Sequence, residues 1–429
     1  MDRSNRVERG LPALFDELAQ ARTPDYLEAA IERASARRQR PFWTFPERLL
    51  PMEIAITRVP VTRLPWRQLG VVALIALLLA TAVALYVGSQ TPRLPAPFGP
   101  AANGVVALGR QGDLYVVDTR TTAERLVVGG PDTDEWIGFT PDGTRGVFIR
   151  WGPDSGAMTA AKVGTVELGR EAQPVFVQKD ILHGGEPIEV APNGRDLAFS
   201  AFNFGTPDIR ISVGALDGSA FHTFQDVPVA DYGGLAFLAP DGRELVYVAR
   251  SVNAHTHDIR ALDVATGETR AIVLTALGND IFGNVSAAPD GKHIAYALKS
   301  STGAVSVHVV GTDGSDDRMV GHAPGATFEA WPQWDPQGRR LLIERDGGDG
   351  IVRPVIVDLG GGPDVVVDTT ISPNGAGKAW APDGLSILAQ RTTAEDKPLQ
   401  QELWDARTGR VTTVSWPSTT SPAWQRLAP

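Results

Sequence analysis

The segment Trp331-Pro332-Gln333-Trp334-Asp335-Pro336-Gln337-Gly338 contains the unit from which the rest of the fold follows. Its last three residues form a Pro-polar-Gly motif, which occurs after residue 100 at Pro141, Pro192, Pro240, Pro289, Pro336 and Pro382. Successive prolines are 51, 48, 49, 47 and 46 residues apart. Proline presets the first turn position and glycine supplies a positive φ, so each motif reverses the chain between two strands. The period is that of a four-stranded β-propeller blade.

The number of blades follows from the hairpins between the turns. Seven hairpins are expected, at residues 113–128, 162–177, 208–224, 258–274, 305–320, 354–367 and 402–414. Six complete turns leave the first blade one strand short. The last segment, 421–425, aligns with 331–335, so we expect the strand of Trp424 to complete the first blade and close the ring. The sequence predicts a mostly β fold, a seven-bladed β-propeller over residues 103–429.

The repeats resemble those of the TolB propeller family, which belongs with the WD40-like repeat folds. The resemblance rests on Trp-x-x-Trp-Asp-Pro-Gln-Gly at 331–338 and Trp-Ala-Pro-Asp-Gly at 380–384, and it covers about residues 103–427. It implies a TolB-like propeller whose loops bind another molecule.

Composition and charge narrow the classes of partner. The chain has 429 residues with 45 Gly and 32 Pro, as expected for many turns, and no Cys, which excludes disulfides and thiolate metal sites. The formal net charge is −10, divided into +3 for residues 1–69 and −13 for the remainder. Because an acidic domain repels phosphates, we expect no nucleic acid partner.

Residues 69–87 form an uncharged apolar run of nineteen residues. As a helix it spans about 28 Å, close to the roughly 30 Å hydrocarbon core of a bilayer. We therefore predict a transmembrane helix over 67–89, followed by a Pro-rich linker at 90–102. The basic residues on its N-terminal side are Arg48, Arg58, Arg63 and Arg67, against Arg93 on the other, which predicts a single-pass bacterial inner-membrane protein with a cytoplasmic N-terminus and an extracytoplasmic propeller.

Residues 1–66 are predicted to hold two short amphipathic helices, because apolar residues recur at helical spacing and Thr23-Pro24 provides a cap and a first helical position. Their stripes and the Pro-bounded aromatic stretch at 41–46 either anchor the segment at a membrane surface or dock a cytoplasmic protein. The docking candidates are Leu14, Phe15, Leu18, Tyr26, Trp43 and Phe45.

The cytoplasmic segment, roughly residues 10–55, resembles that of bacterial anti-sigma-factor-like membrane proteins with TolB-like propellers. The resemblance is carried by Leu-Phe-Asp-Glu-Leu at 14–18, Thr-Pro-Asp-Tyr-Leu at 23–27 and Arg-Pro-Phe-Trp-Thr-Phe-Pro-Glu-Arg at 40–48. It implies a sigma-factor-like partner at residues 1–65. The segment departs from zinc-containing anti-sigma domains, since it has no Cys and no His precedes residue 183.

Motifs for chemistry are sparse. The sequence lacks Gly-x-Ser-x-Gly, Gly-x-x-x-x-Gly-Lys-[Ser/Thr] and His-Glu-x-x-His, so we predict no cofactor and no enzyme activity. His255 and His257 are weak metal candidates, because alternation puts both on one face of an extended segment; a polar loop is the simpler interpretation. The acidic turns 313–317 and 346–350 lack the ligand spacing of an EF-hand. Tryptophans 334, 380 and 424 are better explained by packing between blades than by sugar stacking.

Three functions are compatible with this architecture. The leading hypothesis is a membrane-anchored propeller that binds or senses a protein, peptide or other ligand and signals to the cytoplasmic partner. The second is an envelope scaffold of the TolB type with a passive anchor. The third, from another class, is a propeller lyase or hydrolase with its site in the central channel.

Overall fold

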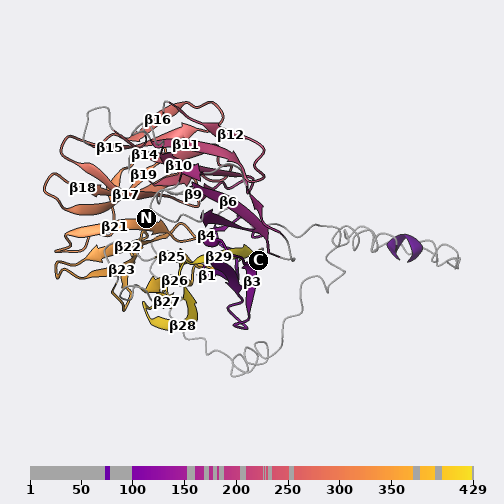
Figure 1. The fold of residues 1–429 in the computed structure, drawn as a ribbon. Coiled ribbons are helices and arrows are strands. Elements are labelled where there is room, and N and C mark those ends of the chain that lie inside the picture. Colours follow the sequence, from indigo (N-terminus) through magenta and orange to yellow (C-terminus); the bar gives the residue numbers. More distant parts are fainter. Residues whose placement is uncertain are drawn as a thin grey trace, which may run out of the picture. The chain divides into compact units, whose positions relative to one another are not determined.

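The computed structural model describes residues 73–77, 99–151, 160–168, 173–176, 181–182, 188–202, 209–225, 227, 229, 234–250, 256–370, 377–391 and 399–427. Contacts divide the chain into two compact units, Met1–Ser89 and Gln90–Pro429. All strands among the described residues lie in the second unit. Figure 1 shows their colours running once around that unit, with yellow β29 (Ala423–Leu427) returning beside indigo β1 (Ala102–Arg110).

The strands form seven antiparallel units of about four strands each, which we call blades 1 to 7. The first three are blade 1, β29, β1, β2 (Asp113–Val117) and β3 (Glu124–Val128); blade 2, β4 (Thr133–Phe139), β5 (Arg145–Trp151), β6 (Ala160–Glu167) and β7 (Val175–Phe176), with β8 (Ile181–Leu182) also on β6; and blade 3, β9 (Ile188–Val190), β10 (Asp196–Phe202), β11 (Ile209–Ala215) and β12 (Phe221–Thr223).

The remaining four are blade 4, β13 (Leu235–Phe237), β14 (Glu244–Arg250), β15 (His257–Asp263) and β16 (Thr269–Val273); blade 5, β17 (Asp280–Ala287), β18 (His293–Lys299), β19 (Val305–Gly311) and β20 (Arg318–Met319); blade 6, β21 (Phe328–Trp334), β22 (Arg340–Asp346), β23 (Val352–Asp358) and β24 (Val365–Val366); and blade 7, β25 (Lys378–Trp380), β26 (Ser386–Arg391), β27 (Leu399–Asp405) and β28 (Val411–Ser418). A single parallel bridge, Val305 to Phe328, joins blades 5 and 6.

The Pro-polar-Gly turns lie between the first and second strands of blades 2 to 7. Their glycines have φ between 65° and 71°, a conformation that suits glycine and lets the two strands pair directly. The first strands of neighbouring blades contact one another, as β13 does with β9 and β17. The first strands therefore form the inner wall of the propeller, and all turns of this type lie at one end of that wall, which we call the turn end.

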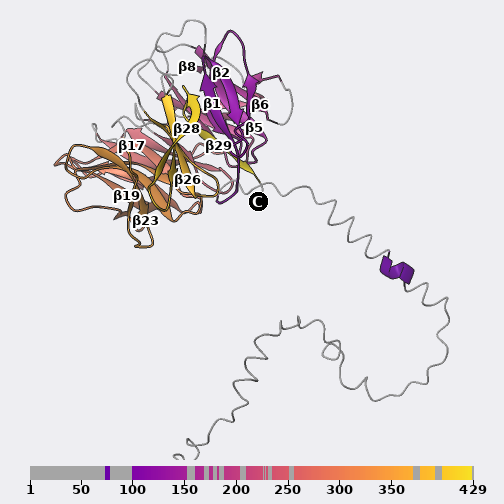
Figure 2. The same ribbon diagram turned by 90° about the horizontal axis from the view of Figure 1, so that it is seen from below.

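Blade 1 has no such turn, because its first strand comes from the C-terminus. Trp424 of β29 pairs with Val106 of β1. Two amides hold the join in place. Asn103 donates to Asp383 Oδ2 at 2.8 Å and accepts from the Asp383 N–H, and Gln425 accepts from the Val105 N–H and donates to the Gly143 carbonyl. In Figure 2 the yellow strands of blade 7 and β29 lie between the orange blades and the indigo-to-magenta blades.

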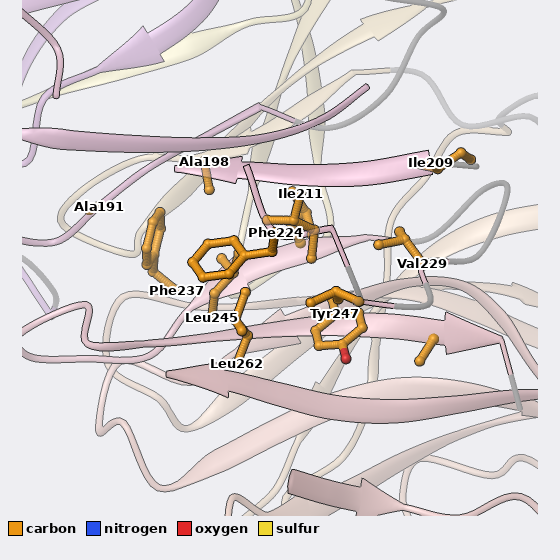
Figure 3. Close-up of a cluster of buried hydrophobic side chains, with 13 residues drawn as sticks. Ala191, Ala198, Ile209, Ile211, Phe224, Val229, Phe237, Leu245, Tyr247 and Leu262 are labelled. Atoms are coloured by element: carbon orange, nitrogen blue, oxygen red, sulfur yellow. The ribbon is translucent and has the colours of Figure 1, made fainter. Parts of the chain in front are cut away.

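The cores are layers between adjacent blades. Figure 3 shows the layer between blades 3 and 4, where Ile211 and Phe224 of one blade face Leu245 and Tyr247 of the next, all of them buried. The alternation of side chains along each strand explains this arrangement, since every strand presents one set of residues to each neighbouring blade.

The prediction of a membrane helix is corrected by the structure. In the described part of the chain, helix occurs only at residues 73–77, and no helix there is long and apolar enough to span a membrane. The fold class with a transmembrane helix over 67–89 and the single-pass inner-membrane location are therefore not supported. The two predicted amphipathic helices lie outside the described residues.

Candidate functional site

The first strands of blades 5, 6, 7 and 1 line an open pocket of about 340 Å³ near the turn end, which we call the turn-end cavity. The cavity lies against the end of β17, the end of β21, two residues of β25 and the end of β29. Its polar and aromatic lining residues are Ser286, Gln333, Trp334, Asp335, Lys378, Trp380 and Arg426.

Two tryptophans form the aromatic part of the wall, and both are fixed by neighbours. Trp334 donates its indole N–H to the Ser286 carbonyl at 3.1 Å. The Arg340 guanidinium lies 5.2 Å from the ring centroid of Trp380. Arg340 is itself held by Asp335 at 2.9 Å and by the Gly384 carbonyl at 2.7 Å. The rings are therefore positioned before any ligand arrives.

Lys378 supplies a buried positive charge. Its ammonium forms an ion pair with Glu344 of blade 6, and the two side chains are 4% and 0% exposed. Burial raises the pKa of the Glu344 carboxyl, and Lys378 partly opposes that shift. Glu344 Oε2 has no hydrogen-bond partner among the described residues. The pair costs desolvation energy that an apolar pair of similar volume would avoid.

Arg426 brings a second cation to the same wall. Its guanidinium donates to the Gly99 carbonyl at 2.7 Å, which ties β29 to the segment leading into β1. Burial lowers the pKa of this guanidinium from its ordinary value, although an arginine of this kind remains protonated. The acid on the wall, Asp335, is buried and already accepts from Arg340 and from the backbone N–H groups of Arg339 and Arg340.

The wall therefore combines the Arg426 guanidinium, a lysine that is already paired with Glu344, two aromatic faces and one acid whose oxygens are occupied. Such a lining suits an anionic group attached to a flat or apolar body. Among the described residues, no three His, Cys, Asp or Glu side chains form a group that could hold a metal ion.

A larger cleft of about 620 Å³ lies on the outer side of blades 6 and 7. Its two arginines already have acidic partners: Arg353 lies 2.9 Å from Asp349, and Arg391 lies 3.6 Å from Glu402. The cleft carries no aromatic side chain in its lining. Its chemistry is less specific than that of the turn-end cavity.

The residues singled out from the sequence are dispersed. His257 begins β15 and its Nδ1 lies 2.8 Å from Asp280, whereas His255 lies outside the described residues. Trp424 packs with Val106 in the layer between blades 7 and 1. Oxygens of the acidic turns are used internally, as when Asp346 accepts from the N–H groups of Gly348 and Gly350. The docking candidates Leu14, Phe15, Leu18, Tyr26, Trp43 and Phe45 also lie outside the described residues.

Sequence reasoning missed Lys378, Glu344 and Arg426. One signal was present: Glu344 and Arg345 interrupt the buried run of β22, where Ala297 and Leu298 stand at the same distance from the turn in blade 5. Two adjacent charges in a strand buried on both faces require partners on both neighbouring layers.

The comparisons with known proteins agree on the fold. No family model and no curated protein matches the chain. The β-propeller domain of the Trilobed protease from Pyrococcus furiosus matches with a TM-score of 0.52 and 12% identity, over 75% of this chain and 97% of that one. That propeller is described as having an open velcro topology, whereas here β29 pairs with β1. The oligogalacturonate lyase of Vibrio parahaemolyticus matches with a TM-score of 0.51 and 14% identity, over 73% and 86%.

TolB from Acinetobacter baumannii is also similar, with a TM-score of 0.48 and 13% identity, over 76% of this chain and 81% of that one. Identities this low establish the fold and nothing finer. The chain is a β-propeller protein, and the solved structures that match it include TolB, an oligogalacturonate lyase and the β-propeller domain of a protease. The N-terminal resemblance to anti-sigma-factor-like proteins lies outside the described residues.

Proposed function

We propose that this propeller is a binding module that holds an anionic group of a peptide or protein partner in the turn-end cavity. The observation that carries the proposal is the presence of Lys378 and Arg426 on one wall with Trp334 and Trp380. At about 340 Å³ the cavity is at the small end of ligand sites, so it suits one or two residues of a partner. A C-terminal or side-chain carboxylate provides the matching charge.

The test uses a short synthetic peptide ending in Ala-Trp, with a free carboxylate in one form and an amide in the other. Calorimetric titration of the full chain should show binding of the carboxylate form and a loss of about 10-fold or more for the amide, since a hydrogen bond to a charged group contributes about 1.5–3 kcal/mol. Arg426→Gln should weaken the carboxylate form by a similar factor.

The matched control is Arg353→Gln, which removes an arginine from the outer cleft. It should leave the affinity unchanged. Equal affinity for the two peptide forms, or equal affinity of the Arg426→Gln and Arg353→Gln variants for the carboxylate form, would show that the cavity does not recognise an anion. The lyase or hydrolase hypothesis stays a prediction, because the likeness to the lyase extends to the fold alone.

A further inference from the structure

Blade 5 carries a hydrogen-bonded chain of a serine, a histidine and an aspartate, away from the turn-end cavity. Ser306 and His308 are two residues apart on β19, so their side chains share one face of the strand. Ser306 Oγ lies 3.2 Å from His308 Nε2, and His308 Nδ1 lies 3.2 Å from Asp317 Oδ1. Both distances are within hydrogen-bond reach for proton transfer.

The order of the atoms matches the roles of a nucleophile, a base and a group that orients the base. In the neutral tautomer with its hydrogen on Nδ1, His308 donates a hydrogen bond to Asp317 Oδ1, and its Nε2 keeps a lone pair that can accept the Ser306 hydroxyl. Asp317 is fixed in turn by the Tyr296 hydroxyl, which donates to Oδ2 at 2.8 Å. Burial raises the pKa of Asp317, but the hydrogen bonds from His308 and Tyr296 outweigh it, so the pKa lies below its usual value.

The hydrogen-bonded series Ser306–His308–Asp317 differs from the contacts that the other histidines make. Three more histidines of the described residues pair with a carboxylate, namely His257, His293 and His322. Their second ring nitrogen accepts no serine hydroxyl in the described part of the chain, whereas that of His308 does. A carboxylate pair alone is common on a protein surface, but the three-membered chain has the connectivity that activates a hydroxyl.

The side chains of Ser306, His308 and Asp317 can be reached from solvent. Ser306 is partly exposed, and the side chains of His308 and Asp317 are 17% and 40% exposed. Cross-strand partners place apolar groups beside the hydroxyl: Leu298 stands opposite Ser306, and the exposed Met319 stands opposite His308. These neighbours favour a short apolar acyl group over a charged one.

We propose that Ser306 is an activated nucleophile that accepts the acyl group of a small activated ester. Ser306 Oγ forms a bond to the carbonyl carbon while His308 Nε2 takes the hydroxyl proton. The carbon–oxygen bond to the leaving alcohol breaks, and His308 passes the proton to that oxygen. The products are acyl-Ser306 and the free alcohol, so the step needs no further reactant. This reactivity is separate from the anion site and survives if that proposal fails.

The experiment incubates the full chain with p-nitrophenyl acetate and, in parallel, with a fluorophosphonate probe. Intact mass and peptide mapping should find one added group, on Ser306. Ser306→Ala should abolish that label, and Asp317→Asn, which leaves the hydroxyl in place but disturbs the base, should slow it on the order of 100-fold.

The matched control is Ser300→Ala, because Ser300 has a hydroxyl contact of 2.8 Å with Thr302 and no histidine. It should label as the unaltered chain does. Thermal unfolding of each variant checks that the fold is kept. No label on Ser306, or an equal label spread over several serines, would overturn the proposal.

Discussion

The layer between blades 3 and 4 and the layer between blades 6 and 7 are built from the same repeat but differ in polarity. In the first, the hydrophobic cluster includes Phe237 and Leu245, and the charged side chains of Asp258 and Arg260 lie 4.0 Å apart near the start of β15. In the second, apolar residues such as Leu342 and Ile387 share the layer with the buried ion pair Glu344–Lys378. The 3–4 layer therefore serves mainly stability, whereas the 6–7 layer gives up part of that stability and places a charge at the turn-end cavity.

The largest effect is expected from breaking the ion pair. Lys378→Met leaves Glu344 buried without its partner, and the loss of one member of a buried pair costs about 3–5 kcal/mol. Urea unfolding at neutral pH, followed by tryptophan fluorescence, measures the change. A loss below about 1 kcal/mol would mean that the pair contributes no more than an exposed one.

The same variant has a pH dependence with a definite sign. Burial raises the folded-state pKa of Glu344 above its unfolded value of about 4.3, so the cost of ionising it is present above that value and disappears as pH falls below it. The difference in stability between Lys378→Met and the unaltered chain should therefore shrink on acidification. A difference that stays constant would indicate that lost packing, rather than the charge, is the cause.

In the apolar layer, Leu245→Ala should cost about 2–5 kcal/mol, because the side chain is fully buried among Phe224 and Tyr247 and leaves a cavity. Urea unfolding at several pH values measures both size and pH dependence. Unlike the ion-pair variant, this one should show the same deficit at every pH. A strong dependence on pH would contradict the contrast between the two layers.

The smallest effect, and one of opposite sign, is expected when the 6–7 layer is made to resemble the 3–4 layer. The double variant Glu344→Leu with Lys378→Met should be as stable as the unaltered chain or more stable by about 1–4 kcal/mol. Urea unfolding of the two single variants and the double variant completes a mutant cycle. A double variant as unstable as Lys378→Met would show that the ion pair is needed for the fold.

The repeat made much of the propeller predictable. The spacing of Pro141, Pro192 and the later motifs located the first turn of blades 2 to 7, and the motif in β29 located the last strand. The membrane helix was the main error. A hydropathy run records apolar composition, and among the described residues no helix is long and apolar enough to span a membrane.

The candidate sites were beyond sequence reasoning for a physical reason. Local rules of turn and strand chemistry act over a few residues. Lys378 and Glu344, in contrast, are 34 residues apart in the sequence, and Arg426 and Gly99, which share a hydrogen bond, are 327 residues apart. These contacts depend on how the blades pack around the ring.

The sequence alone determined the repeat, the turn chemistry and the strand that closes blade 1, because each depends on local pattern. The tertiary structure alone decided which charged side chains share the turn-end cavity and that Asp317 reaches the histidine beside Ser306. Both depend on contacts between strands, which periodicity does not encode.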